Sequence, residues 1–365
     1  MRRMLALVAC WLFGGCLDVA ERRAERDEQI GRAERGALRV HVSDGLAVVR
    51  DLQPGRLELW ANAPSLRVML TLPAEAPREW VLRARNVLPG VQLRVREAGG
   101  REVFAQPLES ALATESTFAF TAEPGSSLQL DLASADADAP DPFDFIAFAD
   151  VQDAIDRVQD VFAKMNTVSS ARFAVMAGDI TESGGAEECE RFQREQQGLR
   201  IPIYATLGNH ELGDSKVPYH DYFGRGSQSF VFHQARFTTL DSASATVDLK
   251  VYTWLDHWLE QGRGGAHFVF MHIPPLEPVG IRNGAFSSRA EAHKLLARLG
   301  RGDVTGTFYG HIHSYYRFDN VGIPAFISGG GGAIPERFDD VGRHFLVVSA
   351  DPKSRGFSTR LVRVD

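Results

Sequence analysis

Five short polar segments, each directly after a run of apolar residues, constrain this chain most. Each apolar run has the length and composition of a buried strand; the runs cover residues 143–149, 173–177, 201–207, 268–271 and 304–309. In an open α/β sheet the carboxyl ends of the strands share one edge, so we expect the polar segments to meet there. Those segments are Asp150-Val151-Gln152, Gly178-Asp179, Gly208-Asn209-His210-Glu211, His272 and Gly310-His311-Ile312-His313.

The side chains expected at this edge are carboxylates, amides and imidazoles. They comprise two Asp, one Asn, one Gln and four His, with no thiolate. Oxygen and imidazole ligands of this kind suit divalent or trivalent ions such as Mn, Fe, Co or Zn. Asp179 could bridge two such ions, which would make the chain a hydrolase with a two-metal centre.

The five segments, in this order, resemble the signature blocks of the calcineurin-like metallophosphoesterase superfamily. That pattern is D-x-H, G-D-x-x, G-N-H-[ED], a single His after a strand, and G-H-x-H, and four of the five blocks match in full. The resemblance covers about residues 143–350. It implies a two-sheet α/β fold and hydrolysis of a small phosphate ester by a metal-bridging hydroxide, with the choice between monoester and diester left open.

The resemblance also implies a role for each polar side chain. His210 would not bind metal but would donate a proton to the leaving-group oxygen, an effect worth about 10² to 10⁴ in rate. A purely packing or hydrogen-bonding role for His210 is the alternative. The first metal would be held by Asp150, Asp179 and His313, with Gln152 as the fourth candidate, and the second by Asp179, Asn209, His272 and His311.

The chain departs from the family pattern at Gln152, where most members have His. An amide oxygen is a weaker and harder ligand than an imidazole. We therefore expect the first site to bind metal less tightly, or to favour Mn or Fe over Zn. Direct ligation by Gln152, ligation through water and orientation of substrate all stay open.

The remaining sequence divides into regions by composition. Residues 37–132 contain short β-prone stretches separated by turn residues, which predicts a small all-β, sandwich-like domain. Residues 133–142 have two prolines and no apolar period, as a linker does. Strands and helices alternate in residues 143–365, which predicts an α/β domain, a two-sheet α/β sandwich by resemblance.

The N-terminal residues predict export from the cytoplasm. Residues 1–16 have basic residues, an apolar stretch and small residues before Cys16, like a bacterial lipoprotein signal. We expect Cys16 to carry a lipid that anchors the protein to the cell envelope, in the periplasm or at the outer membrane; a plain signal or an uncleaved anchor is the alternative. The Glu- and Arg-rich residues 17–36 would then form a solvated tether.

The overall charge argues against some functions. A formal net charge of -7 disfavours electrostatic binding of nucleic acid, so a nuclease with the same fold is not favoured. A non-catalytic envelope scaffold or binding protein with the same fold is the main alternative to an enzyme. Outside the five blocks, His220 is the histidine best placed to shape substrate choice, because it lies in the loop after the third block.

Overall fold

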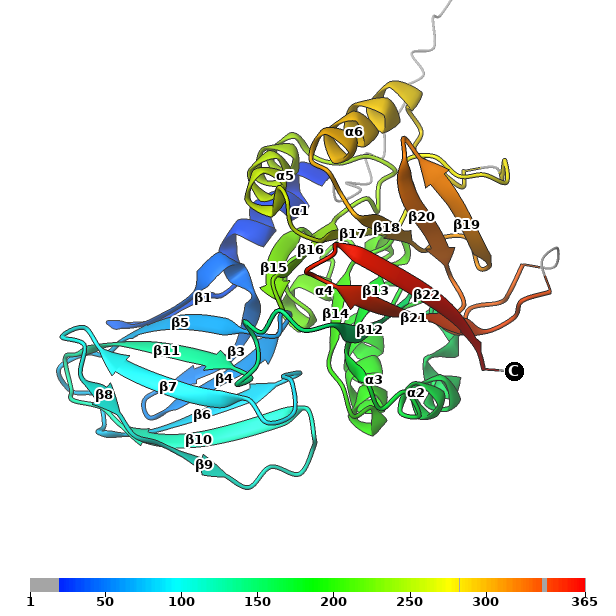
Figure 1. Cartoon of the computed structure of the whole chain (residues 1–365). Helices are drawn as coiled ribbons and strands as arrows, with labels where there is room; N and C mark the ends of the chain where they lie inside the picture. The colour runs from blue at the N-terminus through cyan, green and yellow to red at the C-terminus, as the bar shows by residue number, and fades with distance from the viewer. Residues whose placement is uncertain (1–19, 282, 337–339, 365) are drawn as a thin grey trace, which may run out of the picture.

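The structure is a computed structural model that describes residues 20–281, 283–336 and 340–364. Figure 1 shows a β-sandwich in blue and cyan, followed by a part from green to red in which strands and helices alternate. No helix within the described ranges is long and apolar enough to cross a membrane. The expected signal segment 1–16, with Cys16, lies outside the described residues.

The all-β domain expected before the linker is a sandwich of two sheets. Their strand orders are β1-β2-β5-β11-β7-β8 and β3-β4-β6-β10-β9, and β4 and β6 pair in parallel within an otherwise antiparallel arrangement. Along β5, Leu66, Val68 and Leu70 are buried and the alternate residues are exposed, so one face lines the core. The strands are β1 (Arg32–Arg35), β2 (Leu38–Val42), β3 (Ala47–Gln53), β4 (Arg56–Ala61), β5 (Leu66–Thr71), β6 (Glu79–Arg85), β7 (Gln92–Glu97), β8 (Glu102–Val103), β9 (Ala105–Leu108), β10 (Glu115–Thr121) and β11 (Ser127–Ala133).

The second domain has the predicted two-sheet α/β architecture. Its strand orders are β14-β13-β12-β21-β22 and β15-β16-β17-β18-β20-β19. Strands β12, β13 and β14 are mutually parallel, as are β16, β17, β18 and β20. The strands are β12 (Phe143–Phe148), β13 (Ala171–Ala177), β14 (Ile203–Thr206), β15 (Gln228–Phe232), β16 (Ala235–Leu240), β17 (His267–Met271), β18 (Gly306–Tyr309), β19 (Tyr315–Asn320), β20 (Ile323–Ser328), β21 (His344–Asp351) and β22 (Gly356–Arg363).

Phenylalanines join these two sheets face to face. Phe145 of β12 lies against Phe237 of β16 and Phe268 of β17, with ring centroids 5.1 and 5.3 Å apart. Phe268 and Phe270 lie two residues apart on β17, so both rings point to the same face of their sheet. This aromatic layer fixes the separation of the sheets and therefore the positions of their strand ends.

Helices cover the outer faces of both sheets (Figure 1). Phe162 and Phe192 join Met176 in one apolar cluster, whereas Leu255 and Leu295 belong to another with residues of β17. The helices are α1 (Ala20–Gln29), α2 (Gln159–Met165), α3 (Ala186–Glu195), α4 (Tyr219–Tyr222), α5 (Leu249–Gly262) and α6 (Arg289–Arg301), with short 3₁₀ turns η1 (Ser43–Gly45), η2 (Gln152–Arg157), η3 (Gln196–Gly198) and η4 (His210–Leu212).

The expectation of a solvated tether at residues 17–36 was wrong for the described part of that segment. Residues 20–29 form helix α1, and β1 joins the first sheet. Arg23 is fully buried and its Nε donates to Asp241 Oδ2 at 2.7 Å. Asp27 accepts from the backbone N–H groups of residues 226 and 227 at 2.8 and 2.9 Å. Arg23 and Asp27 are therefore bonded inside the second domain, whereas neighbours such as Arg22 remain exposed.

The predicted linker has little regular secondary structure, but it is hydrogen-bonded to the second domain. Asp136 pairs with Arg172 at the start of β13, with an Nη2 to Oδ1 distance of 3.0 Å. The backbone N–H of His233 donates to the carbonyl oxygen of Ala137 at 2.9 Å. These contacts hold residues 134–142 against the second domain, so the sandwich is docked and is not a loosely connected module.

Candidate metal centre

The five polar segments lie at the carboxyl ends of strands β12, β13, β14, β17 and β18, as predicted. The backbone turns sharply there, and four residues have a positive φ that non-glycine residues rarely adopt. These angles are 65° at Asp150, 49° at Gln152, 52° at Asp179 and 71° at His311. Such conformations persist where the surrounding contacts hold them, and they are common at functional sites.

Three residues form a compact group of potential metal ligands. Asp179, His272 and His311 each offer one ligand atom, and these atoms lie within 4.8 Å of one another. His272 Nε2 lies 3.1 Å from Asp179 Oδ2 and 3.0 Å from Asn209 Oδ1. The structure therefore brings together all four residues assigned to the second metal. Their role as ligands stays a prediction.

The residues assigned to the first metal lie beside this group. His313 Nε2 is 3.6 Å from Asp150 Oδ1 and 3.2 Å from Gln152 Nε2. Gln152 Nε2 also donates to Asp179 Oδ2 at 2.8 Å, so Asp179 contacts residues of both proposed sites. This position fits the expected bridging carboxylate.

The side chain of His210 lies at the edge of the cluster and is 30% exposed. Its Nδ1–H donates to the carbonyl oxygen of Glu182 at 2.7 Å, and its Nε2 lies 3.9 Å from Asp179 Oδ2. Burial opposes protonation, but the carboxylates of Asp179 and Glu182 and the Glu182 carbonyl outweigh it and raise the pKa of His210. This arrangement suits a proton donor better than a metal ligand.

Backbone carbonyls orient the three imidazoles assigned to metals. His272 Nδ1–H donates to Ala177 O at 2.9 Å, His311 Nε2–H to Asn283 O at 2.8 Å, and His313 Nδ1–H to Ile334 O at 2.9 Å. Each bond fixes one ring nitrogen as the donor and leaves the other available as a ligand, as is usual around bound metals. The motif pattern did not reveal these three carbonyl partners, because two of them lie in loops outside the blocks.

Glu211 is part of the third block, but the sequence pattern alone gave it no role. Its carboxylate is buried, accepting from the backbone N–H groups of Asp179 at 3.0 Å and Gly208 at 2.6 Å. It also accepts from both the N–H and the hydroxyl of Thr181, at 2.8 and 2.9 Å. Glu211 thus ties the second and third blocks together beneath the candidate ligands. The acidic residue at the end of the third block is the feature of the sequence that could have indicated this role.

Two glycines allow the backbone to approach the carboxylates closely. A Cβ at Gly208 would lie 2.1 Å from Asp179 Oδ1, and one at Gly329 would lie 2.7 Å from Asp150 Oδ2. Gly329 begins a run of four glycines that lacks the Lys and Ser/Thr of a phosphate-binding loop. The run is a close-packed turn beneath the site.

The buried charges at the site are only partly compensated by the protein. Burial raises the pKa of Asp150 to about 6. Burial also opposes ionisation of Asp179, but the positive charge of His272 and its hydrogen bond hold the pKa of Asp179 below its ordinary value. Burial would lower the pKa of His272, yet the carboxylates of Asp179 and Asp150 raise it to about 9. A buried proton thus balances carboxylate charge where a cation would fit.

The candidate ligands fit a pair of borderline metal ions. The set combines two buried carboxylates, two amides and three imidazoles. The ligand atoms of Asp179, His272 and His311 lie within 4.8 Å of one another. Oxygen and imidazole donors are the ligands that Mn, Fe, Co and Zn prefer in such sites. His220, by contrast, is 1% exposed and its Nε2 lies 3.4 Å from Asp27, so it is buried against α1 and does not face a substrate.

The sequence is similar to two curated phosphodiesterases. It is 26% identical over 155 residues to a 3',5'-cyclic-nucleotide phosphodiesterase of Nostoc sp., covering 39% of this chain and 56% of that protein. It is 27% identical over 180 residues to a glycerophosphodiester phosphodiesterase of Enterobacter lignolyticus, covering 42% of this chain and 61% of that protein. The chain thus spans only 56% and 61% of the length of these relatives.

Solved structures resemble the chain at low sequence identity. A dimetal phosphatase from Danio rerio matches with a TM-score of 0.47 and 15% identity, covering 62% of this chain and 100% of that one. The structure of PhoD matches with a TM-score of 0.47 and 11% identity, covering 83% of this chain and 88% of that one.

The family comparison agrees with the strand-end motifs. Residues 143–315 match the family model for calcineurin-like phosphoesterase, and this range includes all five polar segments. The match begins at the first residue of β12 and ends just after the last block. Over these residues the second domain matches the calcineurin-like phosphoesterase family.

Proposed function

We propose that this protein hydrolyses phosphate esters with a two-metal centre at the strand ends of its second domain. The observation that carries the proposal is the position of Asp179, which contacts Gln152 of the first ligand set and His272 of the second. The match of residues 143–315 to the family model for calcineurin-like phosphoesterase supports the same reaction class. When bound, two such ions activate a water molecule and neutralise charge on the phosphoryl oxygens.

The side chains at the strand ends would bind the two ions and hold the surrounding loops in place. Asp150, Gln152 and His313 would hold one ion, Asn209, His272 and His311 the other, and Asp179 both. Glu211 would keep the loops of Asp179 and Asn209 in register through its hydrogen bonds to the backbone. Rigid placement of this kind matters because a small displacement of reacting groups costs large factors in rate.

His210 would supply the proton that the departing alkoxide needs. Its Nδ1–H is committed to the Glu182 carbonyl, which leaves Nε2 as the nitrogen on the side of Asp179. The raised pKa of His210 keeps a larger fraction of the imidazole protonated near neutral pH. Donation from Nε2 to the leaving oxygen would then avoid release of a strongly basic alkoxide.

Within the phosphate esters, we propose a phosphodiester as the substrate class. Both curated relatives are named as phosphodiesterases, although they share only 26% and 27% identity with the chain. A diester carries one negative charge and two ester oxygens, so one of them can leave while the other stays on the product. The identity of the leaving group is not constrained by the residues at the metals.

The test is hydrolysis of bis(p-nitrophenyl) phosphate and p-nitrophenyl phosphate by the full chain loaded with Mn or Co. We expect faster hydrolysis of the diester, and a kcat about 10² to 10⁴ lower for His210→Asn with unchanged metal content. The control is His257→Asn, an exposed histidine of α5. Metal-loaded protein that cleaves neither ester would favour the non-catalytic scaffold instead.

We further propose that a lipid on Cys16 holds the protein at the cell envelope. Helix α1 begins at Ala20 and is docked through Arg23, so only residues 17–19 would separate the lipid from the fold. The Cys16→Ser protein should move from the membrane fraction to the soluble fraction, whereas Cys10→Ser should not. Retention of Cys16→Ser in the membrane would contradict this anchor.

A further inference from the structure

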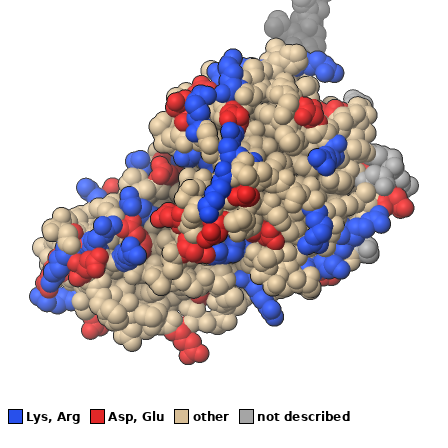
Figure 2. Space-filling view, viewed as in Figure 1, with Lys and Arg blue, Asp and Glu red and all other residues tan. Residues whose placement is uncertain are grey.

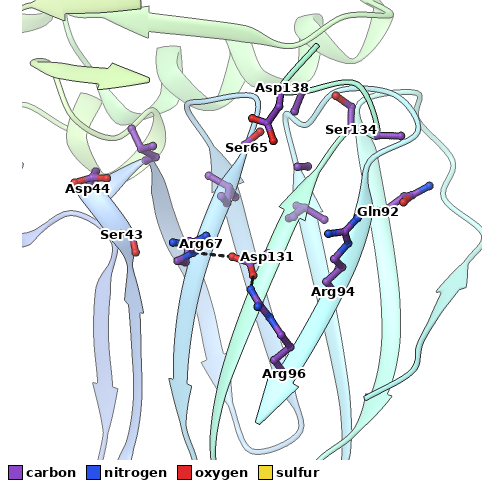
Figure 3. Close-up of a pocket in the computed structure, with 16 residues that line it drawn as sticks. Ser43, Asp44, Ser65, Arg67, Gln92, Arg94, Arg96, Asp131, Ser134 and Asp138 are labelled. Carbon is purple, nitrogen blue, oxygen red and sulfur yellow. Dashed lines mark hydrogen bonds and ion pairs between the residues drawn. The ribbon is translucent and has the colours of Figure 1, made fainter. Parts of the chain in front are cut away.

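The first domain contains a cavity of about 710 Å³ whose lining residues all lie between positions 43 and 138. None of the candidate metal ligands contributes to it. The cavity lies over the outer face of the sheet that contains β5, β11 and β7, and part of the linker closes one end (Figure 3). It is therefore a separate feature, and a ligand bound there would not depend on the proposed phosphoesterase reaction.

Three arginines and one aspartate form the floor of this cavity. Asp131 of β11 lies opposite Arg67 of β5 and opposite Arg94 of β7 in the strand register. Arg96 follows two residues after Arg94, so both side chains project from the same face of the strand. Figure 3 shows these four side chains gathered on neighbouring strands.

The single carboxylate does not satisfy all three guanidinium groups. Asp131 accepts from Arg67 Nε at 2.8 Å, from Arg96 Nη2 at 2.5 Å and from Gln129 Nε2 at 2.7 Å. Arg94 is exposed and has no hydrogen bond or ion pair to any part of the chain that the structure describes. Arg96 Nε is buried and, among the same residues, lacks a hydrogen-bond partner.

This arrangement leaves excess positive charge at one place. Three guanidinium groups against one carboxylate give the floor a surplus of two positive charges, and the two other carboxylates of the lining, Asp44 and Asp138, lie at the rim. Figure 2 shows basic and acidic side chains mixed over the visible face of the first domain, so the surplus is local and not part of a broad basic field. A guanidinium fork without a partner matches the geometry of a carboxylate or phosphate group.

Outside this floor the described lining of the cavity includes polar side chains and carries no cation. Ser43, Ser65 and Gln92 line it, and none of their side chains makes a hydrogen bond to the described residues. Asp44 and Asp138 are exposed at its rim and offer acceptors for hydroxyl groups. No aromatic side chain is among the described residues that line the cavity, so a neutral sugar would lack a ring on which to stack.

We propose that this cavity binds a polyhydroxylated anion, a sugar or polyol that carries a carboxylate or phosphate group. The oxyanion would bind Arg94 bidentately and accept from Arg96, while hydroxyl groups would bond to Ser43, Ser65, Gln92 and the rim carboxylates. The same chemistry could come from an acidic envelope saccharide or from a free phosphorylated sugar. The volume of about 710 Å³ is in the range of small-molecule binding sites.

Calorimetric titration of the full chain tests this site. The protein carries Asp179→Asn and is kept in a chelator, so that the metal centre does not compete for ligand. The probes are glucuronate for the carboxylate source, glucose 6-phosphate for the phosphate source, and inorganic phosphate and glucose as partial ligands. We expect saturable binding of glucuronate, glucose 6-phosphate or both, tighter than binding of either partial ligand.

Variants in the same background locate the binding. Arg94→Ala should weaken binding about tenfold or more, because one charge-assisted bidentate contact is lost. The matched control is Arg39→Ala, which removes an exposed arginine from the same sheet outside the cavity. The proposal is overturned if neither acidic sugar binds, if inorganic phosphate or glucose binds equally well, or if Arg94→Ala binds like Arg39→Ala.

Discussion

The side-chain amide of Asn86 forms both backbone hydrogen bonds of Ile203 at the free edge of β14. Asn86 Nδ2 donates to Ile203 O at 2.7 Å, and Asn86 Oδ1 accepts from Ile203 N–H at 3.0 Å. Asn62 repeats the arrangement two residues along, at Ala205, with distances of 3.3 and 2.9 Å. The first domain thereby occupies the place of a neighbouring strand, which satisfies an edge that would otherwise be open to pairing.

Loss of the Asn86 amide should therefore destabilise the second domain. Asn86 has a φ of 59°, so Asn86→Gly removes the amide without adding backbone strain. Three buried backbone groups lose this partner, namely the N–H and C=O of Ile203 and the C=O of Ala61. We therefore expect the free energy of unfolding to fall by about 2 to 4 kcal/mol in urea titrations.

Asn166 provides a matched control for this change. Its amide makes the same pair of bonds, to Gly198 O and Arg200 N–H, but at the exposed surface. Water can replace those bonds, so Asn166→Gly should cost less, about 1 kcal/mol. Equal losses for the two variants would argue against a docking role for Asn86.

The buried contact of α1 makes a second prediction about stability. Arg23→Ala would leave the carboxylate of Asp241, only 4% exposed, without its guanidinium partner. Breaking one side of a buried ion pair typically costs about 3 to 5 kcal/mol. Arg22 is the adjacent, exposed arginine, and Arg22→Ala should change the free energy of unfolding by less than about 0.5 kcal/mol. Similar values from thermal or urea unfolding would show that α1 is not integral to the fold.

The buried His267 predicts a pH dependence of stability. Burial, with a smaller effect of Arg236, lowers the pKa of His267 to about 3. In the unfolded chain this imidazole takes up a proton near pH 6.5, whereas in the folded protein it does not. As the pH falls from 6.5 towards 3, the unfolded state is therefore favoured by up to about 1.4 kcal/mol per pH unit from this residue.

Substitution of His267 distinguishes its contribution to the pH dependence of stability from that of the other titrating groups. In metal-free protein, His267→Gln should reduce the loss of unfolding free energy between pH 6.5 and 4. His257→Gln, at an exposed position of α5, should leave that pH dependence as in the wild type. An unchanged pH dependence in His267→Gln would mean that His267 is charged in the folded state.

Gln152 offers a test of the first metal site. Its amide nitrogen bonds to Asp179 Oδ2 at 2.8 Å, so ligation through Oε1 would require the amide to rotate. A histidine at position 152 would not require this rotation, and its imidazole is a better ligand for Zn than an amide oxygen. We expect Gln152→His to bind Zn at the first site more tightly in competition with a chelator, while Gln152→Ala binds it more weakly than wild type. Equal Zn affinity of the three proteins would show that position 152 does not contact the metal.

The sequence was sufficient to predict the second domain and the gathering of its polar side chains. Alternation of strands and helices indicated the layers, and each candidate ligand lay directly after a strand, where topology brings distant residues together. Asp179 and His272, 93 positions apart, meet at 3.1 Å for this reason.

The contacts between domains were not predictable in the same way. The run of Glu and Arg before β1 suggested solvation, because nothing local indicates that Arg23 will meet Asp241, which lies 218 positions away. The docking of Asn62 and Asn86 likewise depends on an edge strand more than 100 positions later. A charge or amide pattern shows what a residue can bond to, but not which distant partner the fold supplies.

The most direct test of the central claim is elemental analysis of wild-type and Asp179→Asn protein, purified in parallel after growth with Mn, Fe, Co and Zn. Asp179 contacts residues of both ligand sets, so its carboxylate should matter for both ions. We predict about two metal ions per wild-type chain and loss of most metal from the variant. Full metal content in a folded Asp179→Asn protein would contradict a two-metal centre bridged by this residue.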